Sequence, residues 1–340
     1  MHTSVDDLQH LLLNDPVARE DFFVAAGTPW YLTLFGRDSL WAARLALPLG
    51  TELAGGTLRA LARRQGTDVV PARAEAPGKI PHELRRVPAV EGSHDLRLPP
   101  VYYGTVDATA LWICTLHEAW RWGLPTAEVI DLLPALRRAL TWLTEIAPGP
   151  DGLLRYLDET GTGLANQGWK DSGDSMRWRD GRIATGPIAL LEAQAYAVEA
   201  AYVAADLLAA LGTGADRRRV PALRAFATRL AQTVRERFWV TSDAGDYLAM
   251  ALDGAGHAVT GVGSNMGHAL GTRTLTQAEA DRVAVVLTGP TLLLGGGIAT
   301  LATDNGGFNP LGYHTGSVWV HDTAICALGL ARQGHADRAV

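Results

Sequence analysis

The residues best suited to chemistry lie in a glycine-rich stretch, residues 166–175, which reads NQGWKDSGDS. It crowds two carboxylates, a lysine and an indole into ten positions. A carboxyl group that is partly buried beside an indole has a raised pKa, because desolvation disfavours its charged form. Asp171, flanked by bulky groups, is therefore a candidate general acid. Asp174 is open to a second interpretation, in which it closes an Asx turn.

Two further loops carry clustered polar groups. Arg37 and Asp38 are adjacent where a loop enters a predicted helix, so a guanidinium and a carboxylate can bind neighbouring sugar hydroxyls. The alternative for Asp38 is a helix N-cap. In the Gly/Pro loop 78–83, Lys79, His82 and Glu83 form a second polar group, for which the alternative is a solvated loop.

A fourth segment, residues 313–322, places histidines, a tryptophan and an aspartate at a loop-to-helix junction. Metal binding by His314, His321 and Asp322 is an alternative, but their spacing fits no familiar zinc motif. The sequence contains no phosphate-binding glycine loop, no nucleophile elbow and no Cys/His pair at a plausible site. We therefore expect neither a metal nor a cofactor.

The elements that must position these segments are helices. The periodicity and capping signals predict helices over residues 38–49, 55–64, 105–122, 126–146, 187–211, 216–238, 276–287 and 315–332. Thr276 and Glu279 predict a capping box. The best strand signal is at residues 152–157, which predict a small hairpin arm. Long non-helical stretches at 67–104, 158–186 and 294–314 are typical of functional loops.

The predicted helices are of two kinds. The helix at 187–211 is apolar on most faces, as expected for a helix buried on both sides, whereas the helix at 216–238 is amphipathic. The helices at 105–122 and 126–146 repeat this contrast. Alternating inner and outer helices predict an all-α fold with two concentric layers, an α/α toroid whose long loops gather at one end and form a pocket.

Composition limits the other functional classes. The 340-residue chain has a formal net charge of −6 and no basic stripe, which argues against a nucleic-acid partner. Its densest basic run, residues 217–219, is interpreted as a solvated helix face. Two cysteines in apolar runs indicate a reducing compartment. We see no signal peptide or membrane-spanning run, so we expect a cytoplasmic protein without a membrane partner.

Taken in order, these segments resemble the helical domain of the amylo-alpha-1,6-glucosidase, or glycogen-debranching, family. The matching segments are residues 29–39 with their LFGRDS core, 77–83, 103–107, 167–175 and 316–319. The resemblance implies an (α/α)6 barrel of the six-hairpin glycosidase type that hydrolyses alpha-glucosidic bonds of glycogen-like or malto-oligosaccharide substrates with inversion. Glucoamylases, trehalases and processing glucosidases are related helical-barrel families.

The resemblance also assigns roles. Asp171 matches the general acid of the family, and Arg37 and Asp38 match its binding pair for the terminal sugar. The remaining predicted substrate-binding residues are His82, Glu83, Tyr103, Asp107, Trp169, Lys170, Asp174, His314 and Trp319.

The sequence departs from the family at both ends. Relatives place a glutamate general base after the segment that matches residues 316–319, and they carry a β-sandwich before the barrel. About nine helices are predicted here, against twelve in a closed barrel. We therefore expect residues 1–340 to form one barrel domain that lacks its last helices, with the base beyond Val340 and little activity in this chain alone. A non-catalytic carbohydrate-binding protein that keeps the sugar pocket is the alternative.

Overall fold

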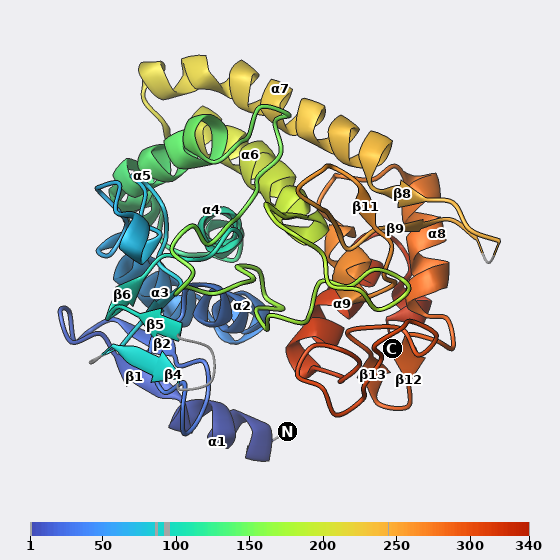
Figure 1. Cartoon of the computed structure of the whole chain (residues 1–340). Coiled ribbons are helices and arrows are strands. Elements are labelled where there is room, and N and C mark those ends of the chain that lie inside the picture. Colours follow the sequence, from blue (N-terminus) through green and yellow to red (C-terminus); the bar gives the residue numbers. More distant parts are fainter. Residues whose placement is uncertain (1, 86–87, 92–95, 244, 340) are drawn as a thin grey trace. The chain divides into compact units, whose positions relative to one another are not determined.

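The computed structural model describes residues 2–85, 88–91, 96–243 and 245–339 (Figure 1). The chain divides into two compact units. Unit 1 comprises Met1–Ala147, Asp158–Gly163 and Ala200–Arg224, and unit 2 comprises Pro148–Leu157, Leu164–Glu199 and Ala225–Val340. Two long helices, α6 (Leu191–Leu211) and α7 (Gly214–Arg237), contribute residues to both units.

Unit 1 is built from packed helices. They are α1 (His2–His10), α2 (Gly36–Leu45), α3 (Glu52–Ala62), α4 (Ala108–Arg121) and α5 (Thr126–Thr141), which a π-helical turn at Trp142–Ile146 extends. Helix α2 packs against α3 and α4, and α4 packs against α5. Trp112 of α4 is fully buried, and its indole N–H donates to the carbonyl of Leu58 in α3 at 3.0 Å. This bond satisfies the polar atom of an otherwise apolar core residue.

Short antiparallel strand pairs lie between these helices. The pairs are β1 (Leu12–Asn14) with β2 (Phe22–Val24), β3 (Glu83–Leu84) with β6 (Val101–Tyr102), and β4 (Ala89–Glu91) with β5 (Leu96–Leu98). Four of these strands fall in residues 67–104, which the sequence predicted to be without regular structure. Strands of two or three residues are too short for an alternating pattern to show, so periodicity does not reveal them.

Besides its parts of α6 and α7, unit 2 contains two further described helices and several small sheets. Its elements are β7 (Ala189–Leu190), β8 (Trp239–Val240), β9 (Tyr247–Leu248), β10 (Ala251–Leu252), β11 (Ala258–Val259), a 3₁₀ turn at Ser264–Ala269, α8 (Gln277–Leu287), β12 (Leu293–Leu294), β13 (Gly297–Ile298) and α9 (Val320–Arg332). The largest sheet among the described residues has three strands, in the order β11-β10-β7. Helices α8 and α9 both pack against the 3₁₀ turn.

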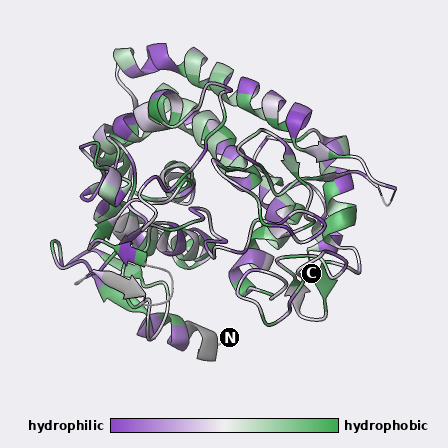
Figure 2. Cartoon of the chain, viewed as in Figure 1, coloured by the Kyte–Doolittle hydropathy of each residue, from purple (hydrophilic) through white to green (hydrophobic). Residues whose placement is uncertain are grey.

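The predicted contrast between buried and amphipathic helices is confirmed. Residues 191–205 of α6 are buried at almost every position, whereas α7 buries one stripe that includes Leu223, Ala227, Leu230 and Val234. Figure 2 shows the same difference, because hydrophilic residues recur along α7 and are sparse along α6. Helices α4 and α5 differ in the same way.

Several predicted boundaries are wrong by a few residues. Helix α9 begins at Val320 rather than at 315, because Ala299 forms a bridge with Val318 and holds that segment extended. Helix α6 begins at Leu191, since the two preceding residues form β7. The predicted hairpin arm at 152–157 makes only isolated bridges, from Leu154 to Pro148 and from Tyr156 to Ile188. Helix α1 was not predicted.

The helices described in the structure include none with both the length and the apolar character that crossing a bilayer requires.

The capping box at the start of α8 gives a test of local stability. The backbone N–H of Thr276 donates to Glu279 Oε2 at 2.8 Å, and Thr276 Oγ1 accepts from the backbone N–H of Glu279. We expect Thr276→Ala to lower the free energy of unfolding by about 1 kcal/mol, because the backbone N–H of Glu279 loses the hydroxyl oxygen that accepts from it. Chemical denaturation measures this. Thr233→Ala in the interior of α7 is the control, and an equal loss there would contradict a capping effect.

Candidate active site

The loop that carries Asp171 is fixed by hydrogen bonds on both sides of that residue. Ser175 Oγ donates to the carbonyl of Lys170 at 2.6 Å, and Asn166 Nδ2 donates to the carbonyl of Ser172 at 2.7 Å. Tyr156 in turn donates its hydroxyl to Asn166 Oδ1 at 2.6 Å. Asp171 is half-buried, as the sequence interpretation of a general acid requires.

Trp169 is the centre of an aromatic cluster in unit 2. Its ring stacks parallel to the imidazole of His268 at 5.8 Å and meets His314, Trp319 and His321 edge-on at 5.4, 6.4 and 5.0 Å. His314 stacks on Trp319 at 5.4 Å. Trp169 is buried, whereas Trp319 is half-buried. Trp319, held by its neighbours, thus offers a rigid apolar surface of the kind on which a sugar ring stacks.

His314 joins the aromatic cluster to the loop of Asp171. The imidazole is buried, and its Nδ1 lies 2.9 Å from the hydroxyl of Ser172. Asp174 lies farther out, about half of its side chain is exposed, and it pairs with Arg177 at 3.3 Å. An ion pair thus holds Asp174, whereas His314 contacts Ser172, the residue that follows Asp171.

Lys170 does not point toward solvent. Its side chain is fully buried, and Nζ donates to Asn265 Oδ1 at 2.6 Å and to the carbonyl of Thr300 at 2.7 Å. Burial lowers the pKa of Lys170, and the nearby carboxylates of Asp322 and Glu192 oppose that shift. Contact with a sugar would require the ammonium to leave both acceptors, so its geometry suits a positioning role better than the predicted substrate contact.

A second buried group lies beneath the Trp169 ring. His268 Nε2 is 2.6 Å from Asp322 Oδ1, and its Nδ1 contacts the hydroxyl of Tyr196. Burial raises the pKa of Asp322, but the hydrogen bond from His268 and the charges of His268 and Lys170 outweigh this, and the net shift is downward. The ligand atoms of His268, Asp322 and Cys326 lie within 4.8 Å of one another. These groups have protein partners: Asp322 accepts from His268, and the Cys326 thiol lies 3.7 Å from the carbonyl oxygen of Ser264.

The three residues that the sequence offers as an alternative metal set differ from this cluster. Asp322 is fully buried with His268, whereas His314 faces Ser172 and His321 meets the edge of the Trp169 ring. The three groups are therefore engaged with different partners.

Unit 1 holds the predicted sugar-binding pair. Arg37 is buried, with Nε 3.5 Å from Asp107 Oδ2, and Thr105 donates its hydroxyl to Asp107 Oδ1 at 2.6 Å. Asp38 is exposed in the first turn of α2, and the N-cap position belongs to Phe35. The N-cap interpretation of Asp38 is therefore wrong, and its carboxylate is open to solvent.

The loop of residues 78–83 is buried, so its interpretation as a solvated loop is also wrong. Lys79 donates to the carbonyl of Ala74 at 3.0 Å, and burial lowers its pKa to about 8, opposed by the charge of Asp107. His82 packs edge-on against Phe35, and Glu83 accepts from Arg85 at 2.9 Å.

Tyr103 is also enclosed. Its hydroxyl donates to the carbonyl of Arg64 at 2.8 Å, and burial, together with the charge of Glu75, raises its pKa to about 12. The hydrogen of the hydroxyl thus already has a protein partner.

Close backbone packing aligns the two loops of unit 1. The backbone N–H of Gly36 donates to the carbonyl of His82 at 2.7 Å. A Cβ at Gly36 would lie 2.1 Å from the carbonyl oxygen of Pro81, so only glycine permits this approach. Gly36 therefore fixes the backbone position from which the side chain of Arg37 extends.

The structure thus groups the predicted residues into two sets. Unit 1 holds Arg37, Asp38, His82, Glu83, Tyr103 and Asp107, and unit 2 holds Trp169, Lys170, Asp171, Asp174, His314 and Trp319. That both sets face one pocket stays a prediction of the sequence. The sequence motifs did not reveal Glu192, Asn265 and His268. The available signal was Glu192 itself, an acidic residue in the apolar, alanine-rich first turns of α6, because a buried acid needs a partner.

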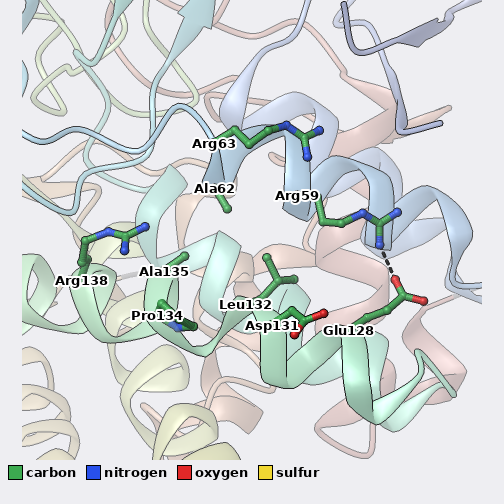
Figure 3. A pocket seen from close by; sticks show the side chains of 9 residues that line it. All are labelled: Arg59, Ala62, Arg63, Glu128, Asp131, Leu132, Pro134, Ala135 and Arg138. Carbon is green, nitrogen blue, oxygen red and sulfur yellow. Dashed lines mark hydrogen bonds and ion pairs between the residues drawn. The ribbon is translucent and has the colours of Figure 1, made fainter. Parts of the chain in front are cut away.

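A groove of about 300 Å³ on unit 1 lies apart from these residues. Charged side chains of α3, its C-cap and α5 line it, among them Arg59, Arg63, Glu128, Asp131 and Arg138 (Figure 3). Arg59 pairs with Glu128, and Arg63 pairs with Asp15 and Asp21, so these guanidinium groups are already neutralised. The groove contains none of the predicted site residues.

The comparison with known families decides the class of the protein. Residues 52–340 match the sequence model of the mannosylglycerate hydrolase MGH1-like glycoside hydrolase domain. The chain belongs to this glycoside hydrolase family. No curated protein sequence gives a significant match.

Solved structures show the fold. The GH63 mannosylglycerate hydrolase from Thermus thermophilus, in complex with Tris, is 15% identical with a TM-score of 0.70, over 99% of this chain and 88% of that one. The complex of the same hydrolase with glucose is 16% identical with a TM-score of 0.69, over 99% of this chain and 88% of that one. Neutral trehalase Nth1 from Saccharomyces cerevisiae is 13% identical with a TM-score of 0.64, over 95% of this chain and 66% of that one. The predicted (α/α)6 six-hairpin glycosidase fold is confirmed. The matched family is the mannosylglycerate hydrolase-like one, not specifically the glycogen-debranching one.

The contact of Gly36 with Pro81 gives a prediction for this glycoside hydrolase. We expect Gly36→Ala to destabilise the protein by about 1–3 kcal/mol, because the added methyl group cannot fit against a backbone carbonyl. Thermal or chemical denaturation measures the change. Gly27→Ala, with open space around the new Cβ, should stay within about 0.5 kcal/mol of the parent. Equal effects of both changes would disprove the packing argument.

His82 gives a pH-dependent prediction. Burial, with the charges of Arg37, Arg85 and Lys79, holds its pKa well below 6.5, and Nδ1 has no hydrogen-bond partner among the described residues. The unfolded chain binds a proton at His82 below about pH 6.5 and the folded one does not, so stability falls as the pH drops through that value. The loss between pH 6.5 and 5 should be about 1.5 kcal/mol.

Chemical denaturation across this pH range measures the slope. His82→Gln should remove the part of this pH dependence of stability that comes from His82. His257→Gln, at an exposed histidine, should leave that part unchanged. An unchanged slope in His82→Gln would show that this imidazole is not buried in its neutral form.

Proposed function

We propose that this glycoside hydrolase cleaves an α-linked hexoside with inversion of configuration, with Asp171 as the general acid. The observation that carries the proposal is the half-buried position of Asp171 in a hydrogen-bonded loop, two residues after Trp169 and its aromatic cluster. A carboxyl group held in this way can act as a general acid and deliver a proton to a leaving oxygen.

In the proposed reaction, Asp171 transfers its proton to the glycosidic oxygen as the bond from that oxygen to the anomeric carbon breaks. A water molecule attacks the anomeric carbon from the opposite face and gives its proton to a carboxylate base. Inverting enzymes hold the two carboxyl groups roughly 6.5–9.5 Å apart to leave room for that water.

Within unit 2, neither of the neighbouring aspartates suits the role of base. Asp322 is fully buried against His268 and cannot meet a water molecule at the sugar. Asp174 lies three positions along the same loop and is paired with Arg177.

For the substrate, we propose a short α-mannoside or α-glucoside. The family match supports it, as do similar solved structures, which include a mannosylglycerate hydrolase bound to Tris and D-glycerate and the same hydrolase bound to glucose. Hydrolysis of glycogen branches or malto-oligosaccharides, which the resemblance in the sequence implies, is the competing specificity. In either case Trp319 would stack on the ring of a hexose, and the binding of sugar hydroxyls by Arg37 and Asp38 stays a prediction of the sequence.

We also propose that the enzyme acts in the cytoplasm. The support is its two buried free thiols, Cys114 and Cys326, which are typical of proteins from reducing compartments.

Replacement of the acid tests the reaction. In the natural full-length protein, we expect Asp171→Asn to lower kcat by about 10²- to 10⁴-fold, because an amide cannot protonate the leaving oxygen. Asp180→Asn is the control, since Asp180 is an exposed carboxylate of the same loop that pairs with Arg182. Steady-state kinetics on α-mannosylglycerate, trehalose and malto-oligosaccharides would give both the rate effect and the specificity.

Proton NMR of the first-formed product distinguishes the stereochemical courses. The β anomer should appear first from an α-linked substrate. The α anomer first, or full activity in Asp171→Asn, would overturn the assignment. Binding of these sugars without hydrolysis by the parent protein would instead identify a carbohydrate-binding protein.

A further inference from the structure

We propose that Lys170 is a positioning residue that holds the general acid in place from inside the protein. Its ammonium fastens the loop of Asp171 to Asn265 and Thr300, and through Asn265 to Glu192. This inference rests on the proposed role of Asp171, and it assigns a purpose to a buried charged network that the reaction itself does not use.

The anchor of the loop is a buried cation. Lys170 Nζ lies 2.6 Å from Asn265 Oδ1 and 2.7 Å from the carbonyl oxygen of Thr300. An ammonium has three N–H donors and no acceptor, so these two bonds fix its direction. The indole ring of Trp169 lies 5.1 Å from Nζ, within the range of a cation–π contact. The cation thus holds its neighbour Trp169 as well as its own loop.

Asn265 links this cation to an anion. While Oδ1 accepts from Lys170, Nδ2 donates to both carboxylate oxygens of Glu192 at 3.0 Å each. A carboxamide offers an acceptor and donors on one side chain, as this arrangement needs. An aspartate at this position would meet Glu192 with like charge, and an aliphatic side chain would leave both ions without this partner.

The charges that surround the ammonium balance it. The carboxylates of Asp322 and Glu192 act on Lys170 electrostatically, and His268 acts on both of them. Burial raises the pKa of Glu192, and His268, the hydrogen bond from Asn265 and Lys170 oppose that shift. A buried cation with hydrogen-bonded partners persists, whereas removal of one partner leaves an uncompensated charge.

The neighbours of Asp171 are therefore fixed on both sides. Before it, Lys170 is held by its ammonium, and its carbonyl accepts from Ser175 at 2.6 Å. After it, Ser172 contacts His314, and its carbonyl accepts from Asn166. A general acid must lie within hydrogen-bond reach of the leaving oxygen, and a displacement of about 1 Å can cost roughly 100-fold in rate. The anchored flanks thus limit where the carboxyl can lie.

The test uses leaving groups that differ in their need for a proton. The parent protein, Lys170→Met and Asp171→Asn are compared on two α-hexosides of the same sugar, one with an alkyl aglycone and one with a 2,4-dinitrophenyl aglycone. An alkoxide cannot leave unprotonated, whereas 2,4-dinitrophenolate can. We expect Lys170→Met to lower kcat on the alkyl hexoside by about 10- to 100-fold, with KM within about threefold and little loss on the activated one.

A matched control separates positioning from general instability. Gln194→Met removes another fully buried polar side chain of α6, two positions from Glu192, that bonds to the backbone of Leu154. It should lower the unfolding temperature without changing the ratio of the two rates. If Lys170→Met does not fold, Asn265→Ser keeps the charge of Lys170 and its bond to Thr300, and it should show the same selective loss at smaller size.

The outcomes separate the inference from the function on which it rests. If Asp171→Asn lowers kcat equally on both substrates, the proposed general acid is wrong. Suppose that Asp171→Asn lowers kcat selectively on the alkyl hexoside. If Lys170→Met and Asn265→Ser then lower kcat equally on both substrates, or on neither, the positioning role is overturned. A selective loss in all three variants supports it.

Discussion

A single buried ammonium organises unit 2 of this glycoside hydrolase. Lys170 lies between a side-chain amide and a backbone carbonyl, beneath the ring of Trp169, and directly before the candidate acid Asp171. Taking a cation out of water is costly, so its surroundings must supply acceptors and counter-charges with good geometry. Asn265, Glu192 and Asp322 supply them, and the aromatic cluster and the acid-bearing loop are built on this arrangement.

In unit 1, close backbone packing positions the polar groups. There Gly36 lets one loop approach the carbonyl of Pro81, and the buried Arg37 faces Asp107. His82 and Lys79 are enclosed beside them, where burial favours their neutral forms. In both units a residue next to a candidate site residue in the chain packs into the protein and holds it in place.

The helices and the chemical segments were largely accessible from the sequence. The all-apolar α6, the amphipathic α7 and the capping box at Thr276 follow from periodicity and from local side-chain chemistry, which act over a few residues. The glycine-rich loop around Asp171 stood out for the same reason. The short strands and the start of α9 could not be predicted from the sequence, because pairing between distant segments decides them.

The sequence by itself determined the class of fold and which segments are candidates for chemistry, because residue type, spacing and periodicity are local properties. Only the tertiary structure decided which way each side chain points. It turned Lys170 inward to Asn265, enclosed His82, and left Asp38 open to solvent. Those outcomes depend on partners 95 or more residues away for Lys170, and a linear pattern contains no record of which distant groups will supply the hydrogen bonds that burial demands.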